Sequence, residues 1–168
     1  MLDVRNIPTV VIGAVALAAH RYIRFTEDID LGVLASLGEM RSLVEALRAE
    51  GFDAEFHEPD AEDPLGGVID ISGSFGLVQL INFEDRFPVV IRDALAGDDV
   101  RIRSGSRLRI MPIPQLVALK LYAGGFKSHA DIVELLRRNP QVDHEVIRAT
   151  CRKYRLCGLD RVLDELPQ

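Results

Sequence analysis

The amino-acid sequence predicts an α+β fold, in which a mixed β-sheet with flanking helices is followed by a helical C-terminal tail. Two observations support this class. Short β-branched or alternating runs mix with helical patterns up to residue 111, and from Pro114 onward the spacing of apolar residues is helical. A length of 168 residues is typical of one compact unit. We expect residues 1–111 to form the α+β core and residues 112–168 to pack on it as the helical part.

The first half of the core is predicted to contain two strands, each followed by a helix. Thr9 to Ile12 is a short β-branched run that ends at a glycine, which is typical of a buried strand, and the alanine-rich segment Ala14 to Tyr22 favours a helix. Asp28 to Val33 alternates acidic and apolar residues, the pattern of a strand with one polar face. Apolar residues at helical spacing predict a helix over Leu37 to Glu50.

The second half of the core is predicted to contain two strand pairs. Residues 53–64 are mostly acidic and polar and end in a proline, which indicates a mobile loop. The segments Val68 to Ser72 and Leu77 to Phe83 are expected to form a hairpin, and Val100 to Arg103 is expected to pair with Leu108 to Met111.

The C-terminal part is predicted to be helical throughout. Pro114 suits the first turn of a helix, because a proline there gives up no helical hydrogen bond. The apolar spacing places four helices, over Gln115 to Ala123, Ser128 to Arg138, His144 to Arg155 and Leu159 to Leu166.

The composition is that of a folded protein without a membrane span. Hydrophobic residues make up 48% of the chain and charged residues 27%. The longest apolar run, Val10 to Ala19, is half the length of roughly 20 residues that a spanning helix needs. No basic, apolar leader opens the sequence, and Cys151 and Cys157 form no Cys-x-x-Cys motif. We therefore expect a reducing, cytoplasmic location.

The charge is divided unevenly between the two parts of the chain. Residues 1–100 carry a balance of −12 and residues 101–168 a balance of +6. A basic surface can face phosphates, and five cations of the last third form a candidate RNA-binding cluster. They are Arg148, Arg152, Lys153, Arg155 and Arg161. The alternative is that these cations lie on solvated faces of amphipathic helices.

The most specific motif joins a glycine turn to a pair of carboxylates. Asp28 and Asp30 occupy positions i and i+2 of one predicted strand, so their side chains project from the same face. Two adjacent carboxylates repel each other, and a hard cation such as Mg²⁺ between them removes the repulsion. Gly13 ends a strand and opens a helix, where free backbone amides favour a phosphate. The motif predicts a phosphate site and a metal site on neighbouring elements.

These residues carry a resemblance to a known family. The stretch VIGAVALAAHRYIRFTEDIDLGV (11–33) resembles the signature of the nucleotidyltransferase superfamily, which has the DNA polymerase β-like fold. That signature is an apolar residue, Gly, then Gly or Ser, a spacer, and Asp-x-Asp. The order of Arg24, Thr26, Asp28 and Asp30 is similar to the AbiEii-type branch, which includes nucleotidyltransferase toxins.

A second block of the sequence resembles the same branch. In PIPQLVALKLYAGGFKSHADIVELL (112–136), Lys120 and Asp131 match a lysine and a downstream aspartate that complete the site of the family. The resemblance places Asp131 and Arg24 among the nucleotide-binding residues, with Arg24 able to reach a phosphate. Thr26 is expected near the nucleotide as well, capping the turn before the acidic strand.

The resemblance implies a nucleotidyltransferase with a two-metal site. Asp28 and Asp30 would hold Mg²⁺, the backbone amides of Gly13 and Ala14 would bind the β and γ phosphates, and Lys120 would add a positive charge. The donor would be a nucleoside triphosphate and the acceptor a hydroxyl of RNA or protein. A toxin role, with an antitoxin as partner, is also implied.

The sequence departs from the family at several positions. Ala14 replaces the second small residue of the signature, and Gly125 and Ser128 stand where an arginine and an aspartate are usual. The third carboxylate of the family corresponds to Gln79, which can ligate a metal through its carbonyl oxygen but cannot act as a base. We retain Gln79 as a nucleotide-binding candidate and assign Asp70, one strand earlier, as the candidate third acid.

These departures leave an alternative function open. A degenerate member of the family would bind a nucleotide or a partner without catalysis, and Gln79 favours that hypothesis. Each motif also has a purely structural explanation: a strand-to-helix turn at Gly13, a solvated strand face at Asp28 and Asp30, and a surface lysine at Lys120. A small protein-interaction domain would need none of them. Their joint order along the chain favours the enzyme.

Overall fold

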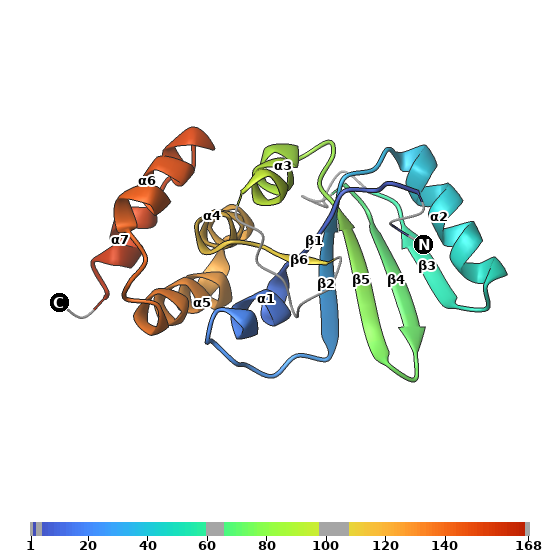
Figure 1. The fold of residues 1–168 in the computed structure, drawn as a ribbon, viewed down its shortest axis with the longest axis horizontal. Helices are drawn as coiled ribbons and strands as arrows, with labels where there is room; N and C mark the ends of the chain where they lie inside the picture. The colour runs from blue at the N-terminus through green and yellow to red at the C-terminus, as the bar shows by residue number, and fades with distance from the viewer. Residues whose placement is uncertain (1, 3–4, 60–65, 98–107, 167–168) are drawn as a thin grey trace.

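A computed structural model describes residues 2, 5–59, 66–97 and 108–166. The architecture is a mixed six-stranded sheet in the order β3-β4-β5-β2-β1-β6 with helices around it (Figure 1). The strands are β1 (Thr9–Val11), β2 (Asp28–Val33), β3 (Asp53–His57), β4 (Val68–Gly73), β5 (Gly76–Asn82) and β6 (Arg109–Ile110). The helices are α1 (Gly13–Ala19), α2 (Leu37–Ala49), α3 (Pro88–Ala96), α4 (Ile113–Ala123), α5 (Gly125–Arg138), α6 (His144–Lys153) and α7 (Leu159–Leu163).

The centre of the sheet is the parallel pair β2 and β5. On one side, β5 continues through an antiparallel meander to β4 and the edge strand β3. On the other side, β2 pairs antiparallel with β1, which pairs in parallel with β6. The residues that begin the chain and those that end the α+β core therefore lie on neighbouring strands.

The helices group at the two ends of the sheet. Helix α2 packs against β3, while α3 joins β1 to α4 and the remaining C-terminal helices gather around α4 (Figure 1). Helix α4 is apolar on nearly all sides, which is typical of a helix enclosed by its neighbours. Its buried residues are Ile113, Leu116, Val117, Ala118 and Leu119. These side chains belong to the same apolar cluster as the strands, so the C-terminal helices share the core of the sheet.

Most of the predicted elements are confirmed. The alternating segment Asp28–Val33 forms β2 over the predicted residues, and the hairpin prediction corresponds to β4 and β5. The helix predicted over Ala14 to Tyr22 is shorter and ends at Ala19, where Tyr22 N–H already bonds back to Leu17. Four helices follow residue 112, as expected.

The prediction of a loop over residues 53–64 is wrong for its first part. Asp53–His57 forms β3, which pairs along its whole length with β4. Ala54 is buried, while Asp53, Glu55 and His57 are exposed. A strand at the edge of a sheet obtains its stability from one neighbouring backbone and tolerates an acidic face, so its composition resembles that of a loop.

Two further segments differ from the sequence analysis. No element was predicted for Pro88–Ala96, which forms α3 and buries Val90, Ile91 and Ala94. Of the second expected strand pair, Val100 to Arg103 lies outside the described residues, and Arg109–Ile110 forms β6 beside β1. Over the part of the chain that the structure describes, no helix is long and apolar enough to cross a membrane.

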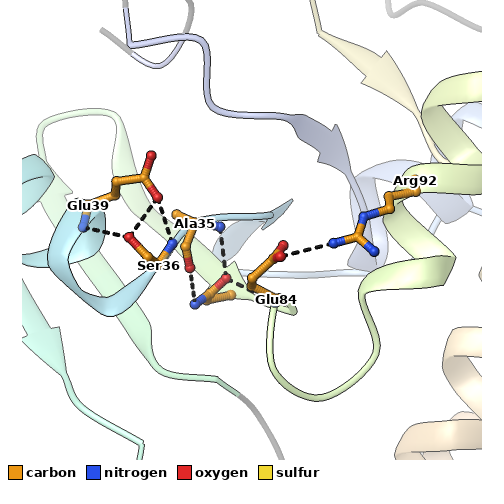
Figure 2. A network of polar contacts seen from close by, with 6 residues as sticks. Ala35, Ser36, Glu39, Glu84 and Arg92 are labelled. Carbon is orange, nitrogen blue, oxygen red and sulfur yellow. Dashed lines mark hydrogen bonds and ion pairs between the residues drawn. The ribbon is translucent and has the colours of Figure 1, made fainter.

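Hydrogen bonds of the Asn82 side chain hold the ends of β2 and β5 together. Asn82 is fully buried, and its side-chain amide donates to the carbonyls of Ala35 (2.8 Å) and Gly66 (3.2 Å). Its oxygen accepts from the backbone N–H of Ala35 and of Glu84, both at 3.2 Å. Figure 2 shows the neighbouring contacts, in which Ser36 and Glu39 form a capping box at the start of α2.

We expect Asn82→Ala to destabilise the fold strongly. The substitution leaves several buried backbone groups without partners, at a cost of about 1–3 kcal/mol for each group that water cannot reach. Urea unfolding should show a total loss of roughly 3 kcal/mol or more with an unchanged slope. Arg92→Ala is the control, because among the described residues it breaks the exposed pair with Glu84 at 2.9 Å, and it should cost less than about 1 kcal/mol. Equal effects of the two substitutions would contradict the prediction.

Candidate active site

The sheet register brings the candidate carboxylates to one face. Asp30 on β2 lies directly opposite Gln79 on β5, and Gln79 lies directly opposite Asp70 on β4. Residues opposite each other on neighbouring strands share a face, and Asp28 shares it with Asp30. Asp28, Asp30, Gln79 and Asp70 therefore occupy one polar surface of the sheet, with Gln79 between the two acids of its row.

The carboxylate of Asp30 fills the space beside Gly13. A Cβ atom on Gly13 would lie 1.7 Å from Asp30 Oδ2, closer than any non-bonded contact allows. Gly13 also has φ +59°, a conformation that favours glycine. The glycine turn and the acidic strand thus meet, and Ala14, the next residue, is buried at the start of α1.

Asp28 and Asp30 affect each other electrostatically. The pKa of Asp30 is raised, first by burial and then by the charge of Asp28, while Lys120, Arg24 and Lys127 act in the opposite direction. A pair of carboxylates whose charges oppose each other at a partly buried position is a donor set that suits a hard divalent cation. Among the described residues, no group of three His, Cys, Asp or Glu side chains is placed to hold a metal ion.

Thr26 holds one member of the pair. Its hydroxyl donates to the side chain of Asp28 and lies 3.3 Å from the backbone carbonyl oxygen of the same residue. Thr26 is expected from the sequence at the turn before the strand. The structure places it there, with its hydroxyl directed to the carboxylate that the motif singles out.

Asp131 is the centre of a second polar cluster. It is only 2% exposed, and its carboxylate lies 2.6 Å from Lys120 Nζ and 3.4 Å from Arg24 Nε. Tyr22 donates its hydroxyl to the same carboxylate at 3.2 Å. The burial of Asp131 leaves little of its surface for a ligand, whereas the two cations that it holds are less buried.

Asp70 has a polar neighbour on each side. Gln79 Nε2 donates to Asp70 Oδ1 at 2.8 Å, and His57 Nε2 lies 3.3 Å from Asp70 Oδ2. Neither His57 nor Tyr22 was predictable as a site residue, because neither has a motif around it. Tyr22 meets Asp131 across 109 residues of sequence, and His57 lies in a segment predicted to be a loop.

A pocket of about 280 Å³ opens beside Asp30. Gly13, Asp30 and Lys120 contribute its polar groups, and its other walls are apolar or aromatic. These walls are formed by Ile12, Ile81, Phe83, Leu116, Leu119, Tyr122 and Ala123. The pocket lies between the sheet and α4, so it joins the two blocks of sequence that carry the resemblance.

The candidate RNA-binding cluster is largely engaged in ion pairs. Arg148 contacts Glu145 (2.8 Å) and Asp160 (3.0 Å), and Lys153 contacts Asp93 at 2.6 Å. Arg152 lies 3.9 Å from Glu145, so three of the five cations have an acidic neighbour within ion-pair distance. This arrangement favours solvated helix faces over a surface specialised for phosphates.

We expect Gly13→Ala to displace Asp30 and abolish divalent-metal binding. The added Cβ meets Asp30 Oδ2, and a non-glycine residue at positive φ costs about 1–2 kcal/mol. Gly51→Ala is the matched control, because Gly51 has φ +85° with nothing within 4 Å of its Cβ position. Both variants should lose stability in thermal unfolding, but only Gly13→Ala should lose Mn²⁺ binding. Retained binding in Gly13→Ala would contradict this geometry.

We expect Asp30→Asn to stabilise the metal-free protein at pH 7.5. The pKa of Asp30 is higher in the folded state than in the unfolded state. Above the folded-state pKa the Asp30 carboxylate is charged, and its charge destabilises the fold in full. Below the unfolded-state pKa the carboxyl group is neutral in both states, and this destabilisation is absent. The gain in Tm, about 2–4 °C for each kcal/mol removed, should therefore shrink at pH 4. Asp53→Asn, on the exposed end of β3, is the control and should change Tm little. A lower Tm for Asp30→Asn at pH 7.5 would refute the argument.

Comparisons with known proteins identify the fold. No family model matches the chain, and no curated protein matches its sequence. Two structures of the antibiotic-resistance factor ANT(2″)-Ia match 92% of this chain with 19% identity and a TM-score of 0.54. One is a solution structure matched over 85% of its length, and the other a crystal structure in complex with adenylyl-2″-tobramycin matched over 90%.

A third structure supports the same assignment. An antigenic nucleotidyltransferase-like protein from Paracoccidioides brasiliensis matches 91% of this chain and 81% of its own length, with 16% identity and a TM-score of 0.52. The mixed six-stranded sheet with flanking helices and C-terminal helices is the part of this chain that these matches cover. The chain therefore has a nucleotidyltransferase-like fold.

Proposed function

We propose that this protein transfers a nucleoside monophosphate from a nucleoside triphosphate to a hydroxyl acceptor, with Mg²⁺ as cofactor. The observation that carries the proposal is the meeting of Gly13, Asp30 and Lys120 in one pocket, with Asp28 beside Asp30 on the same strand face. These groups come from three separate segments of the chain. Their convergence in a nucleotidyltransferase-like fold supports the activity more strongly than any one of them.

The proposed chemistry divides between the metal and the residues of the chain. Bound Mg²⁺ neutralises charge on the triphosphate and makes the acceptor hydroxyl easier to deprotonate. Asp28 and Asp30 would hold the metal, with Thr26 keeping Asp28 in place. The backbone amides of Gly13 and Ala14 would donate to the β and γ phosphates.

Lys120 would donate to a phosphate while it remains bonded to Asp131. An ammonium group has three donors, and the ion pair at 2.6 Å uses one of them. Asp131 would hold Lys120 and Arg24 near the phosphates and act through them, which fits its burial. The apolar walls of the pocket, with Phe83 and Tyr122, offer surfaces for a base or ribose.

Two similarities to known proteins support the choice of acceptor class. The resemblance to the AbiEii-type branch implies a hydroxyl of RNA or protein and a toxin controlled by an antitoxin. The ANT(2″)-Ia complex contains an adenylylated small molecule, so an amino-sugar hydroxyl belongs in the acceptor screen. The ion pairs of Arg148 and Lys153 favour a protein or small-molecule acceptor over extended RNA.

A second candidate function is nucleotide binding without transfer. The observation that favours it is Gln79, which stands beside Asp30 where the family has its third carboxylate. A glutamine cannot accept the proton of an acceptor hydroxyl. In such a protein Asp28 and Asp30 would still bind metal and nucleotide, and Gln79→Asp would produce transfer that the wild type lacks.

We expect nucleoside triphosphate with Mg²⁺ to raise the Tm of the wild type. Ligand at 100 times its Kd stabilises by about 2.7 kcal/mol, or roughly 5–10 °C for a chain of this size. Asp28→Asn/Asp30→Asn should abolish the shift, and Asp53→Asn on the same sheet should preserve it. Transfer of α-labelled nucleotide to an RNA, protein or amino-sugar acceptor then separates enzyme from binder. If nucleotide and Mg²⁺ still raise the Tm of the Asp28→Asn/Asp30→Asn variant, the nucleotide does not bind at the proposed site.

A further inference from the structure

We propose that Gln79 supplies a third protein oxygen to the metal site of Asp28 and Asp30, and that Asp70 is a positioning residue that turns the Gln79 amide toward it. The inference rests on the proposed function, because it concerns the same metal site. It assigns Asp70 a different role from the third acid expected from the sequence.

The sheet register places Gln79 and not Asp70 beside the carboxylate pair. Neighbouring strands lie about 4.8 Å apart, so the backbone of Asp70, two strands from Asp30, is roughly 10 Å away. Oxygens that share one Mg²⁺ ion at about 2.1 Å lie within about 4.2 Å of each other. Gln79 stands between the two acids and is the nearer side chain of the row.

The chemistry of the amide group determines which atom of the Gln79 side chain faces Asp70. An ionised carboxylate only accepts hydrogen bonds, so the group of Gln79 that faces Asp70 must be its NH₂. The amide oxygen is bonded to the same carbon on its other side. The hydrogen bond of 2.8 Å to Asp70 uses Nε2, so Oε1 is the atom of Gln79 that would serve the metal beside Asp30, the residue opposite Gln79 on β2.

His57 contributes to the position of Asp70. Its Nε2 lies 3.3 Å from Asp70 Oδ2, while Gln79 occupies Oδ1, so both carboxylate oxygens have a partner. A carboxylate held from two sides rotates less freely than one with a single partner. The three side chains form a continuous polar chain across β3, β4 and β5 that ends beside the carboxylate pair.

A neutral oxygen ligand suits this site. Asp28 and Asp30 already place two carboxylates on the same face of β2, so a third carboxylate at residue 79, directly opposite Asp30, would add repulsion before the metal binds. A carbonyl oxygen is a normal ligand of a hard cation and adds no charge. Because no three His, Cys, Asp or Glu side chains of the described ranges converge on a metal position, the amide completes a donor set that acids alone do not provide.

The test measures binding of Mn²⁺ alone, from the electron paramagnetic resonance signal of the free ion, to the full chain. Gln79→Leu and Asp70→Leu should each weaken binding by about 10-fold or more, the usual effect of losing a ligand or its hydrogen-bonded support. Glu55→Leu is the matched control, because Glu55 lies opposite Asp70 on the far side of the same row. It removes a carboxylate from the same face and should leave the affinity within about twofold.

The double variant Asp70→Leu/Gln79→Leu separates positioning from ligation. If Asp70 acts only through Gln79, the double variant binds Mn²⁺ as weakly as Gln79→Leu alone. Additive losses would show that Asp70 ligates the ion independently and would overturn the proposal. As a rescue, Asp70→Asn/Gln79→Glu keeps a hydrogen bond with donor and acceptor exchanged, and it should bind Mn²⁺ at least as tightly as the wild type. Circular dichroism of each variant confirms that the fold is intact.

The same titration distinguishes this inference from the proposed function. If Asp28→Asn/Asp30→Asn loses Mn²⁺ while Gln79→Leu binds like the wild type, the metal site stands and the role of Gln79 is refuted. If the wild type itself binds no Mn²⁺, both the proposed function and this inference are refuted. Weaker binding in Gln79→Leu and Asp70→Leu, without additivity, supports both.

Discussion

The contact between Gly13 and the carboxylate of Asp30 is the constraint on which the candidate site depends. It requires β1 to end beside β2 at a residue without a side chain, and the antiparallel pairing of these strands provides that register. The same contact brings the start of α1 to the acidic face. Any side chain at residue 13 would separate the two parts of the motif.

Interactions between charged side chains connect this contact to the helical part of the chain. Asp30 and Asp28 are opposed by the nearby cations Lys120 and Arg24, which are themselves held by the buried Asp131. The C-terminal helices thus hold positive charge near a site whose acids come from the sheet. Helix α4 carries Lys120, and Asp131 of α5 contacts both Lys120 and Arg24. The raised pKa of Asp30 follows from burial and from the charge of Asp28, and the two cations act against both.

The elements with a strong local pattern were predictable from the sequence. The alternation in Asp28–Val33 gave both ends of β2, and the paired acids on one face followed directly from the period of a strand. The strand Asp53–His57 and the helix Pro88–Ala96 were not predictable in this way. The first is an acidic edge strand, and the second is short, so pairing with β4 and packing on α4 outweigh local propensity.

The sequence by itself determined the α+β class, the candidate acids, the glycine turn and the lysine, because each depends on residue type and local spacing. The nucleotidyltransferase-like fold was implied by the resemblance to the family and is shown by the comparison of structures. Tertiary structure alone decided how the candidate residues are used. Gln79 stands between Asp30 and Asp70 because β5 enters the sheet between β2 and β4, and Asp131 meets Tyr22 across 109 residues. Such contacts are set by chain topology and burial, and neither is encoded in the spacing of residues along the sequence.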